Sequence, residues 1–150
     1  MDPETDYPYP IAVALEGLRR AEDGGVDARL PALLRVHDAV VRTLALLSLA
    51  SYVDRGPQSA SVDMLLQRRF LAKALGSGDW GDLLHQLVRP LRSAPDRCAF
   101  PELVTFWISP TGRLTQHAQA LSRMAPLRAK WEQQRLGLGP KQASSSGSRA

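Results

Sequence analysis

Four residues near the end of the chain have side chains that could hold an anion. Arg128, Lys130 and Arg135 are cationic, and Trp131 lies among them. A guanidinium group can bind a phosphate through two parallel hydrogen bonds, and an indole ring can stack on a base. These four residues are therefore the candidate contacts for an anion, RNA or a protein partner. The simpler interpretation is that the cations line a solvated helix face and that Trp131 packs into the core.

Charge is distributed unevenly along the chain. The net charge is +4. From residue 112 to the end there are seven basic residues and a single acid, Glu132, so this part carries +6 and the remainder −2. A basic surface of this kind attracts anionic partners. It keeps RNA binding open, although a solvated helix face followed by a basic tail accounts for the same distribution.

Groups that could carry out catalysis are sparse. His37, His85 and His117 do not lie at spacings that metal sites use, and we expect His37 to pack into the apolar stripe of its helix. Cys98, the single cysteine, has no nucleophile motif around it and excludes an internal disulfide. The Gly-Ser-Gly sequence at residues 76–78 lacks the preceding strand and the lysine of a phosphate-binding loop. We therefore expect no catalytic residue, no cofactor and no metal.

Length and composition indicate one globular domain. The chain has 150 residues, of which 44 % are hydrophobic, and this is enough to build a core. Three of its first six residues are acidic and none is basic, whereas a secretory signal begins with basic residues. The longest apolar stretch, residues 43–53, is shorter than the roughly 20 residues that span a bilayer. The sequence therefore predicts a cytoplasmic protein that does not enter a membrane.

Apolar residues recur at helical spacing along the chain, and no alternating strand pattern is found. Pro10 is expected to begin the first helix, and Gly56 and Pro57 to end the second. The second helix is the longest, and its second half is apolar nearly all round, as is typical of a helix packed on several sides. A fourth helix has a clear apolar stripe, formed by Trp80, Leu83, Leu84, Leu87, Val88 and Leu91. We predict an all-α fold, a single bundle of about five to six helices with a long central helix.

Composition also predicts the limits of the bundle. Residues 1–8, rich in proline and acid, are expected to form a flexible leader, and residues 9–136 the helical bundle domain. Residues 137–150 are rich in glycine and serine, a composition typical of disordered tails. The last helix is expected over about residues 114–136, with a kink at Pro126.

The order of these helices resembles bacterial domains of the HEPN type. The similarity is carried by Ile-Ala-x-Ala-Leu at residues 11–15, by Leu-Leu-Arg-Val-x-Asp-Ala-Val-Val-Arg-x-Leu-Ala at residues 33–45, by Gly-Asp-Trp-x-x-Leu-Leu at residues 78–84, and by the terminal helix. It covers about residues 8–136 as a pattern of helices and short phrases. Such domains often accompany kinases, proteases or other effectors in signalling and conflict systems. Their catalytic members cleave RNA without metal, using two protomers.

The catalytic motif of that family is degenerate in this chain. In the family, an Arg is usually followed by a polar residue and, four to six residues after the Arg, by a His. Arg128 matches the Arg, but Ala129 replaces the polar residue and Gln133 stands where the His would be. A glutamine amide cannot exchange a proton near neutral pH, so it cannot act as a general acid or base. The resemblance thus implies the fold and a dimer, but not the active site.

The sequence supports three functional hypotheses. The first is a non-catalytic helical module of a bacterial signalling or defence system, which forms a homodimer or docks a protein partner through an apolar helix face. The second is an RNA-binding or RNA-cleaving HEPN-type protein that uses its basic last helix. The third is an accessory subunit of an enzyme encoded elsewhere. Because the catalytic His is missing, we favour the first.

Overall fold

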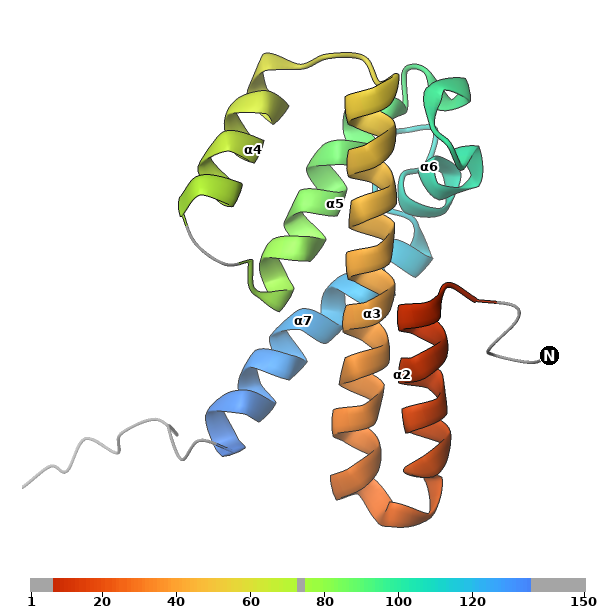
Figure 1. The fold of residues 1–150 in the computed structure, drawn as a ribbon, viewed down its shortest axis with the longest axis vertical. Coiled ribbons are helices and arrows are strands. Elements are labelled where there is room, and N and C mark those ends of the chain that lie inside the picture. Colours follow the sequence, from red (N-terminus) through yellow and green to blue (C-terminus); the bar gives the residue numbers. More distant parts are fainter. Residues whose placement is uncertain (1–6, 73–74, 136–150) are drawn as a thin grey trace, which may run out of the picture.

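The computed structural model describes residues 7–72 and 75–135, and these ranges contain six α-helices, two short 3₁₀ helices and no strand (Figure 1). The α-helices are α2 (Tyr9–Arg20), α3 (Gly25–Asp54), α4 (Ala60–Ala72), α5 (Ser77–Leu91), α6 (Pro101–Trp107) and α7 (Gln116–Arg135). The 3₁₀ helices are η1 (Glu22–Gly24) and η2 (Pro95–Arg97). The predicted all-α bundle with a long helix is confirmed. The predicted tail, and the leader up to residue 6, lie outside the described residues.

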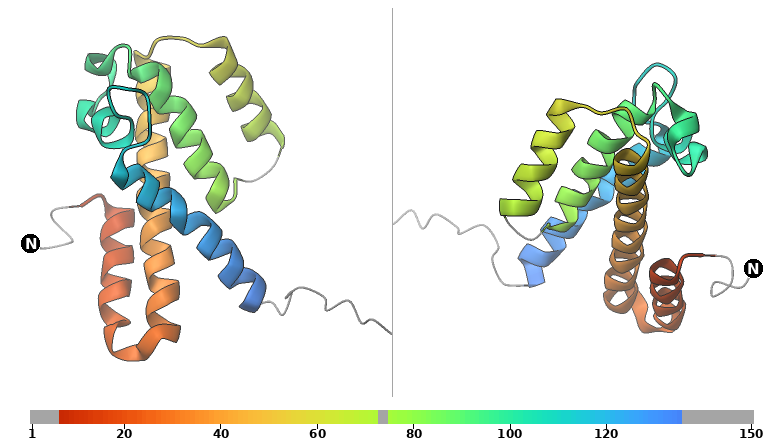
Figure 2. Two further views of the ribbon diagram at one scale, coloured as in Figure 1. Left: turned by 180° about the vertical axis from the view of Figure 1, so that it is seen from behind. Right: turned by 45° about the horizontal axis from the view of Figure 1, so that its top comes forward.

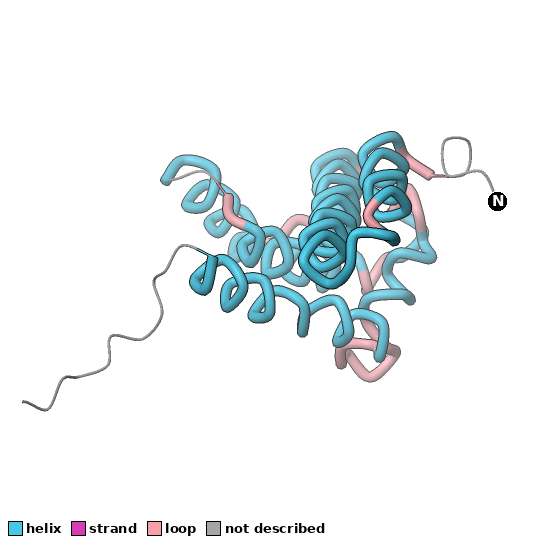
Figure 3. The backbone as a smooth tube through the Cα atoms, turned by 90° about the horizontal axis from the view of Figure 1, so that it is seen from below, coloured by secondary structure: helices cyan, strands magenta, loops and turns pink. Residues whose placement is uncertain are grey.

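Helix α3 is the axis of the molecule. Its 30 residues extend over about 45 Å at 1.5 Å per residue. Helix α2 runs antiparallel along its first half, and α5 packs along its second half (Figure 1). Helix α7 crosses the other side of α3, as the view from behind shows (Figure 2). Seen along α3, α2 lies on the side facing away from α4 (Figure 3). One flank of α3 is therefore covered by several helices and the other by α2 alone.

The main core surrounds α5. Its predicted apolar stripe is confirmed, because the leucines and the valine of the stripe are buried. Of these, Leu84, Val88 and Leu91 pack with residues of α3, α6 and α7. Trp107 of α6, 1 % exposed, is the largest side chain in this cluster. A second cluster forms where α4 meets α3 and α5. We name the two together the α5 core, and its principal buried residues are Ala45, Tyr52, Val62, Leu83, Leu84, Leu87, Val88, Leu91, Trp107 and Ala118.

Polar side chains fix the ends of the helices around this core. The Tyr52 hydroxyl accepts a hydrogen bond from the Ser59 amide at 2.8 Å and donates to Asp63 Oδ1, also at 2.8 Å. This ties the C-terminal end of α3 to the start of α4. The Thr115 hydroxyl accepts from the Ala118 amide at 3.2 Å and so caps α7. Helix α7 then continues through Pro126 to Arg135.

Within residues 7–72 and 75–135, no helix has the length and apolar character needed to cross a membrane.

Candidate functional site

The structure places Arg128 against α3 and not in open solvent. Its Nη1 forms an ion pair with Asp38 Oδ2, and its Nε donates a hydrogen bond to Glu132 Oε1 at 2.7 Å. The Arg128 side chain is 24 % exposed. Arg128 and its two carboxylate partners together carry a formal charge of −1. An anion would therefore have to compete with Asp38 and Glu132 for the guanidinium. Arg128 therefore works first as a link between α7 and α3.

The other predicted contacts on α7 differ in their surroundings. Lys130 is exposed, whereas Trp131 is half-buried. The side chain of Arg135 lies outside the described residues. Ala129 and Gln133, at the two degenerate positions of the HEPN motif, are both exposed. The structure thus does not gather the four predicted residues into one described site, and their contact with RNA or a partner stays a prediction.

His37 lies beside this ion pair and is packed, as predicted. It is 4 % exposed, and its Nε2 lies 2.9 Å from the Leu121 carbonyl oxygen. Since a carbonyl oxygen only accepts, Nε2 carries the proton when the ring is neutral. Nδ1 then faces Asp38 Oδ1 at 3.7 Å, beyond hydrogen-bond distance. Burial lowers the pKa of His37, as does the charge of Arg128, although the Leu121 hydrogen bond opposes both.

The remaining candidate groups for chemistry are dispersed. His85 is half-buried on α5, and burial followed by the charge of Arg89 lowers its pKa. His117, on α7, stacks on Phe106 with ring centroids 5.4 Å apart. The Cys98 thiol is buried and donates to the Ser51 hydroxyl at 3.6 Å. No three His, Cys, Asp or Glu residues in the described part of the chain are grouped so that they could hold a metal ion.

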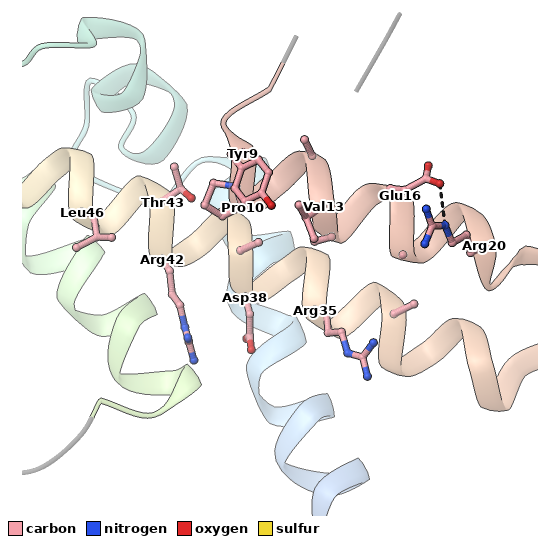
Figure 4. A pocket seen from close by; sticks show the side chains of 15 residues that line it. Tyr9, Pro10, Val13, Glu16, Arg20, Arg35, Asp38, Arg42, Thr43 and Leu46 are labelled. Atoms are coloured by element: carbon pink, nitrogen blue, oxygen red, sulfur yellow. Dashed lines mark hydrogen bonds and ion pairs between the residues drawn. The ribbon is translucent and has the colours of Figure 1, made fainter. Parts of the chain in front are cut away.

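A groove between α2 and α3 is the site that sequence reasoning missed. Its volume is about 1020 Å³ (Figure 4). Alanines form part of its lining, including the buried Ala12 and Ala32. Three larger apolar side chains that line it are well exposed: Tyr9 at 81 %, Val13 at 53 % and Leu46 at 51 %. We name this feature the α2–α3 groove.

Charged side chains lie along one edge of the α2–α3 groove. Arg35, Asp38 and Arg42 extend from α3 away from α2 in Figure 4. Asp38 is engaged by Arg128, so the Arg128 ion pair lies at this edge. Arg42 is placed over Trp80 of α5, with its Cζ 5.9 Å from the ring centroid. Arg35 is exposed.

The acid on the α2 side of the groove is also engaged. Glu16 accepts hydrogen bonds from Arg19 at 2.8 Å and from Arg20 at 2.9 Å. These hydrogen bonds lower the pKa of Glu16 to about 2. Both carboxylates that line the groove therefore already have cationic partners, whereas Arg35 and Arg42 form no ion pair within the described residues. The groove offers an apolar surface with two uncompensated positive charges at one edge.

Comparisons of the chain with protein-family models, with curated proteins and with solved structures found no match. The resemblance to HEPN domains and the dimer that it implies therefore remain predictions, and the geometry of the chain itself is the basis for its function.

Proposed function

We propose that this chain is a non-catalytic helical protein-interaction module that docks its partner through the α2–α3 groove. The main support is the apolar lining of that groove. Tyr9 and Val13 of α2 and Leu46 of α3 line it, and each exposes half or more of its surface. Exposed apolar surface rimmed by charge is typical of protein-binding sites. Following the HEPN resemblance, we place this module in a bacterial signalling or defence system.

The arrangement of the ionisable groups also favours binding over catalysis. The cation that matches the HEPN motif, Arg128, is committed to Asp38 and Glu132. The nearest histidine, His37, is buried and uses its Nε2 on the Leu121 carbonyl. A general acid or base must reach the proton that it transfers, and a side chain enclosed in this way does not reach a substrate.

Selection of binding peptides tests this proposal. A library of helical peptides displayed on particles would be selected on the full chain, and the binders counter-screened on the Val13→Asp variant. We expect binders that lose at least tenfold in affinity on this variant, because a carboxylate in the apolar lining must be desolvated. Val26→Asp is the matched control, since Val26 is 77 % exposed and does not line the groove. Binders with the same affinity for the Val13→Asp variant as for the unsubstituted chain would contradict the proposal.

The solution mass tests whether the partner is a second copy of the chain. Light scattering at two protein concentrations and two salt levels would detect a dimer. A dimer that Val13→Asp dissociates, while Val26→Asp does not, would place the self-association in the groove. A dimer that survives both substitutions would instead favour another surface, such as the one that the HEPN resemblance implies on α7.

The second candidate function is RNA binding by the basic C-terminal third. It is favoured by the +6 charge of that segment and by exposed cations such as Arg123 and Lys130 on α7. Fluorescence anisotropy with a labelled single-stranded RNA at low and high salt tests it, because phosphate contacts make affinity fall steeply with salt. We expect no saturable binding. Salt-sensitive binding that Arg123→Ala and Lys130→Ala abolish would favour RNA binding over protein binding as the function.

A further inference from the structure

We infer that the occupant of the α2–α3 groove is an amphipathic helix that carries carboxylates on one flank, about two helical turns apart. This rests on the proposed function, because it names the chemistry of the partner that the same groove takes. The supporting observations are the shape of the groove, the sign of its unpaired charges and the spacing of those charges along α3.

The shape of the groove favours a helix as the ligand. The groove lies between two antiparallel helices, and its lining comes from both of them (Figure 4). Helix α2 has 12 residues, so the shared surface is about 18 Å long at 1.5 Å per residue. A third helix laid along such a surface places side chains at i, i+3, i+4 and i+7 into it. Its apolar stripe would cover Tyr9, Val13 and Leu46, the exposed apolar residues of the groove.

The charges of the groove favour carboxylates on that helix. Arg35 and Arg42 lie at the edge away from α2, and neither forms an ion pair within the described residues (Figure 4). They are seven residues apart on α3, so their Cα atoms are separated by about 10.5 Å along the helix axis. Asp or Glu residues seven apart on a partner helix have the same spacing and recur on the same face. One flank of the partner can therefore meet both arginines.

The same features disfavour a nucleic acid in the groove. A nucleic acid backbone presents phosphates and sugars, and it would leave the apolar side chains of Val13 and Leu46 without contact. A helix with one apolar face and one acidic flank satisfies the apolar and the cationic parts together.

Two matched peptides test this inference. Both are stapled helices with the same leucine stripe, and they differ only in the residues flanking it, which are Glu in one and Lys in the other at positions seven apart. Their binding to the full chain is measured by fluorescence anisotropy. At low salt we expect the Glu peptide to bind roughly tenfold tighter, since two partly exposed ion pairs form with one peptide and two repulsions with the other. High salt should reduce this difference.

Charge reversal identifies the cations responsible. In the double variant Arg35→Glu, Arg42→Glu the preference should invert, so that the Lys peptide binds tighter. The matched control is Arg29→Glu, an exposed position on α3 that does not line the groove, and it should leave the preference unchanged. Circular dichroism of each variant confirms that the helices remain folded, so that lost binding is not lost structure.

The outcomes separate this inference from the proposed function. Equal affinities, a preference for the Lys peptide, or a preference that survives the double reversal would each overturn the acidic-helix inference. If Val13→Asp weakens both peptides in that case, the groove is still a protein-binding site and the proposed function stands. Self-association that depends on Val13 would identify a second copy of the chain as the occupant, and it would overturn the inference. Failure of both peptides to bind at millimolar concentration would overturn it as well.

Discussion

Ala45 and Leu46 are neighbours in α3 with opposite surroundings. Ala45 is completely buried in the α5 core, whereas Leu46 is 51 % exposed at the α2–α3 groove. Both are apolar, and both belong to the half of the helix that is apolar nearly all round. The difference shows that α3 has two apolar faces, of which several helices cover one and α2 alone partly covers the other. The α5 core holds the domain together, whereas the α2–α3 groove leaves apolar side chains exposed.

The largest effect is expected from Leu84→Ala in the α5 core. Leu84 is 0 % exposed and lies in the cluster with Trp107. Removing its side chain loses buried apolar surface and leaves a cavity, so the free energy of unfolding should fall by about 3 kcal/mol. Urea denaturation followed by circular dichroism measures the change. A loss below about 1 kcal/mol would show that this region is loosely packed and would remove the contrast with the groove.

The second-largest loss of stability is expected from Tyr52→Phe. The hydroxyl of this buried residue accepts from the Ser59 amide and donates to Asp63, and its removal leaves the Ser59 amide without that acceptor. The free energy of unfolding should fall by about 1–2 kcal/mol. Tyr9→Phe, made in the exposed lining of the groove, is the matched control and should change stability by less than about 0.5 kcal/mol. Equal effects of the two substitutions would contradict the contrast between the regions.

Arg128→Ala tests the link between α7 and α3 beside the groove. It removes one partner of Asp38, whose side chain is 14 % exposed, and it should cost about 1 kcal/mol of unfolding free energy. Lys130→Ala, at an exposed position on the same helix, should cost less than about 0.5 kcal/mol. If neither substitution alters stability, Arg128 is free for another ligand and the anion-binding hypothesis gains support.

His37, which lies beside the Asp38–Arg128 ion pair, should make the stability of the protein depend on pH. Burial lowers the pKa of His37 in the folded protein, so between that pKa and the ordinary value of 6.5 the unfolded chain binds more protons. The free energy of unfolding should therefore rise with pH through this window and level off above 6.5. Denaturation curves at pH 5 and pH 7.5 measure the slope. His37→Gln should reduce it, while His117→Gln, at an exposed position, serves as the control.

The smallest effect is expected from Leu46→Ala in the groove. The side chain is half exposed, so its truncation removes little buried surface and should change the free energy of unfolding by less than about 0.5 kcal/mol. The same substitution at Leu84 should cost several times more, and the pair of measurements defines the contrast directly. A cost at Leu46 that grows with protein concentration would mean that a second copy covers the groove in solution.

Local sequence determined the helices and the centre of the core. The apolar stripe from Leu83 to Leu91 has helical spacing, and the structure buries it as the pattern predicts. Pro10 lies in the first turn of α2 and Pro57 follows the end of α3, because proline suits a first turn and cannot continue a helix. These features depend on residues within one or two helical turns of one another, so the spacing of apolar residues and prolines along the sequence is enough to predict them.

Only the tertiary structure decided which apolar face stays exposed and which charges remain unpaired. Asp38 pairs with Arg128, ninety positions along the chain, and this contact depends on how α7 crosses α3. The α2–α3 groove likewise exists because α2 covers just one side of α3, which the repeat of apolar residues in α3 does not reveal. The spacing of apolar residues indicates that one face of a helix is apolar. Whether that face is buried depends on the packing of segments that are distant in the sequence. This packing is what makes the α2–α3 groove the best candidate site.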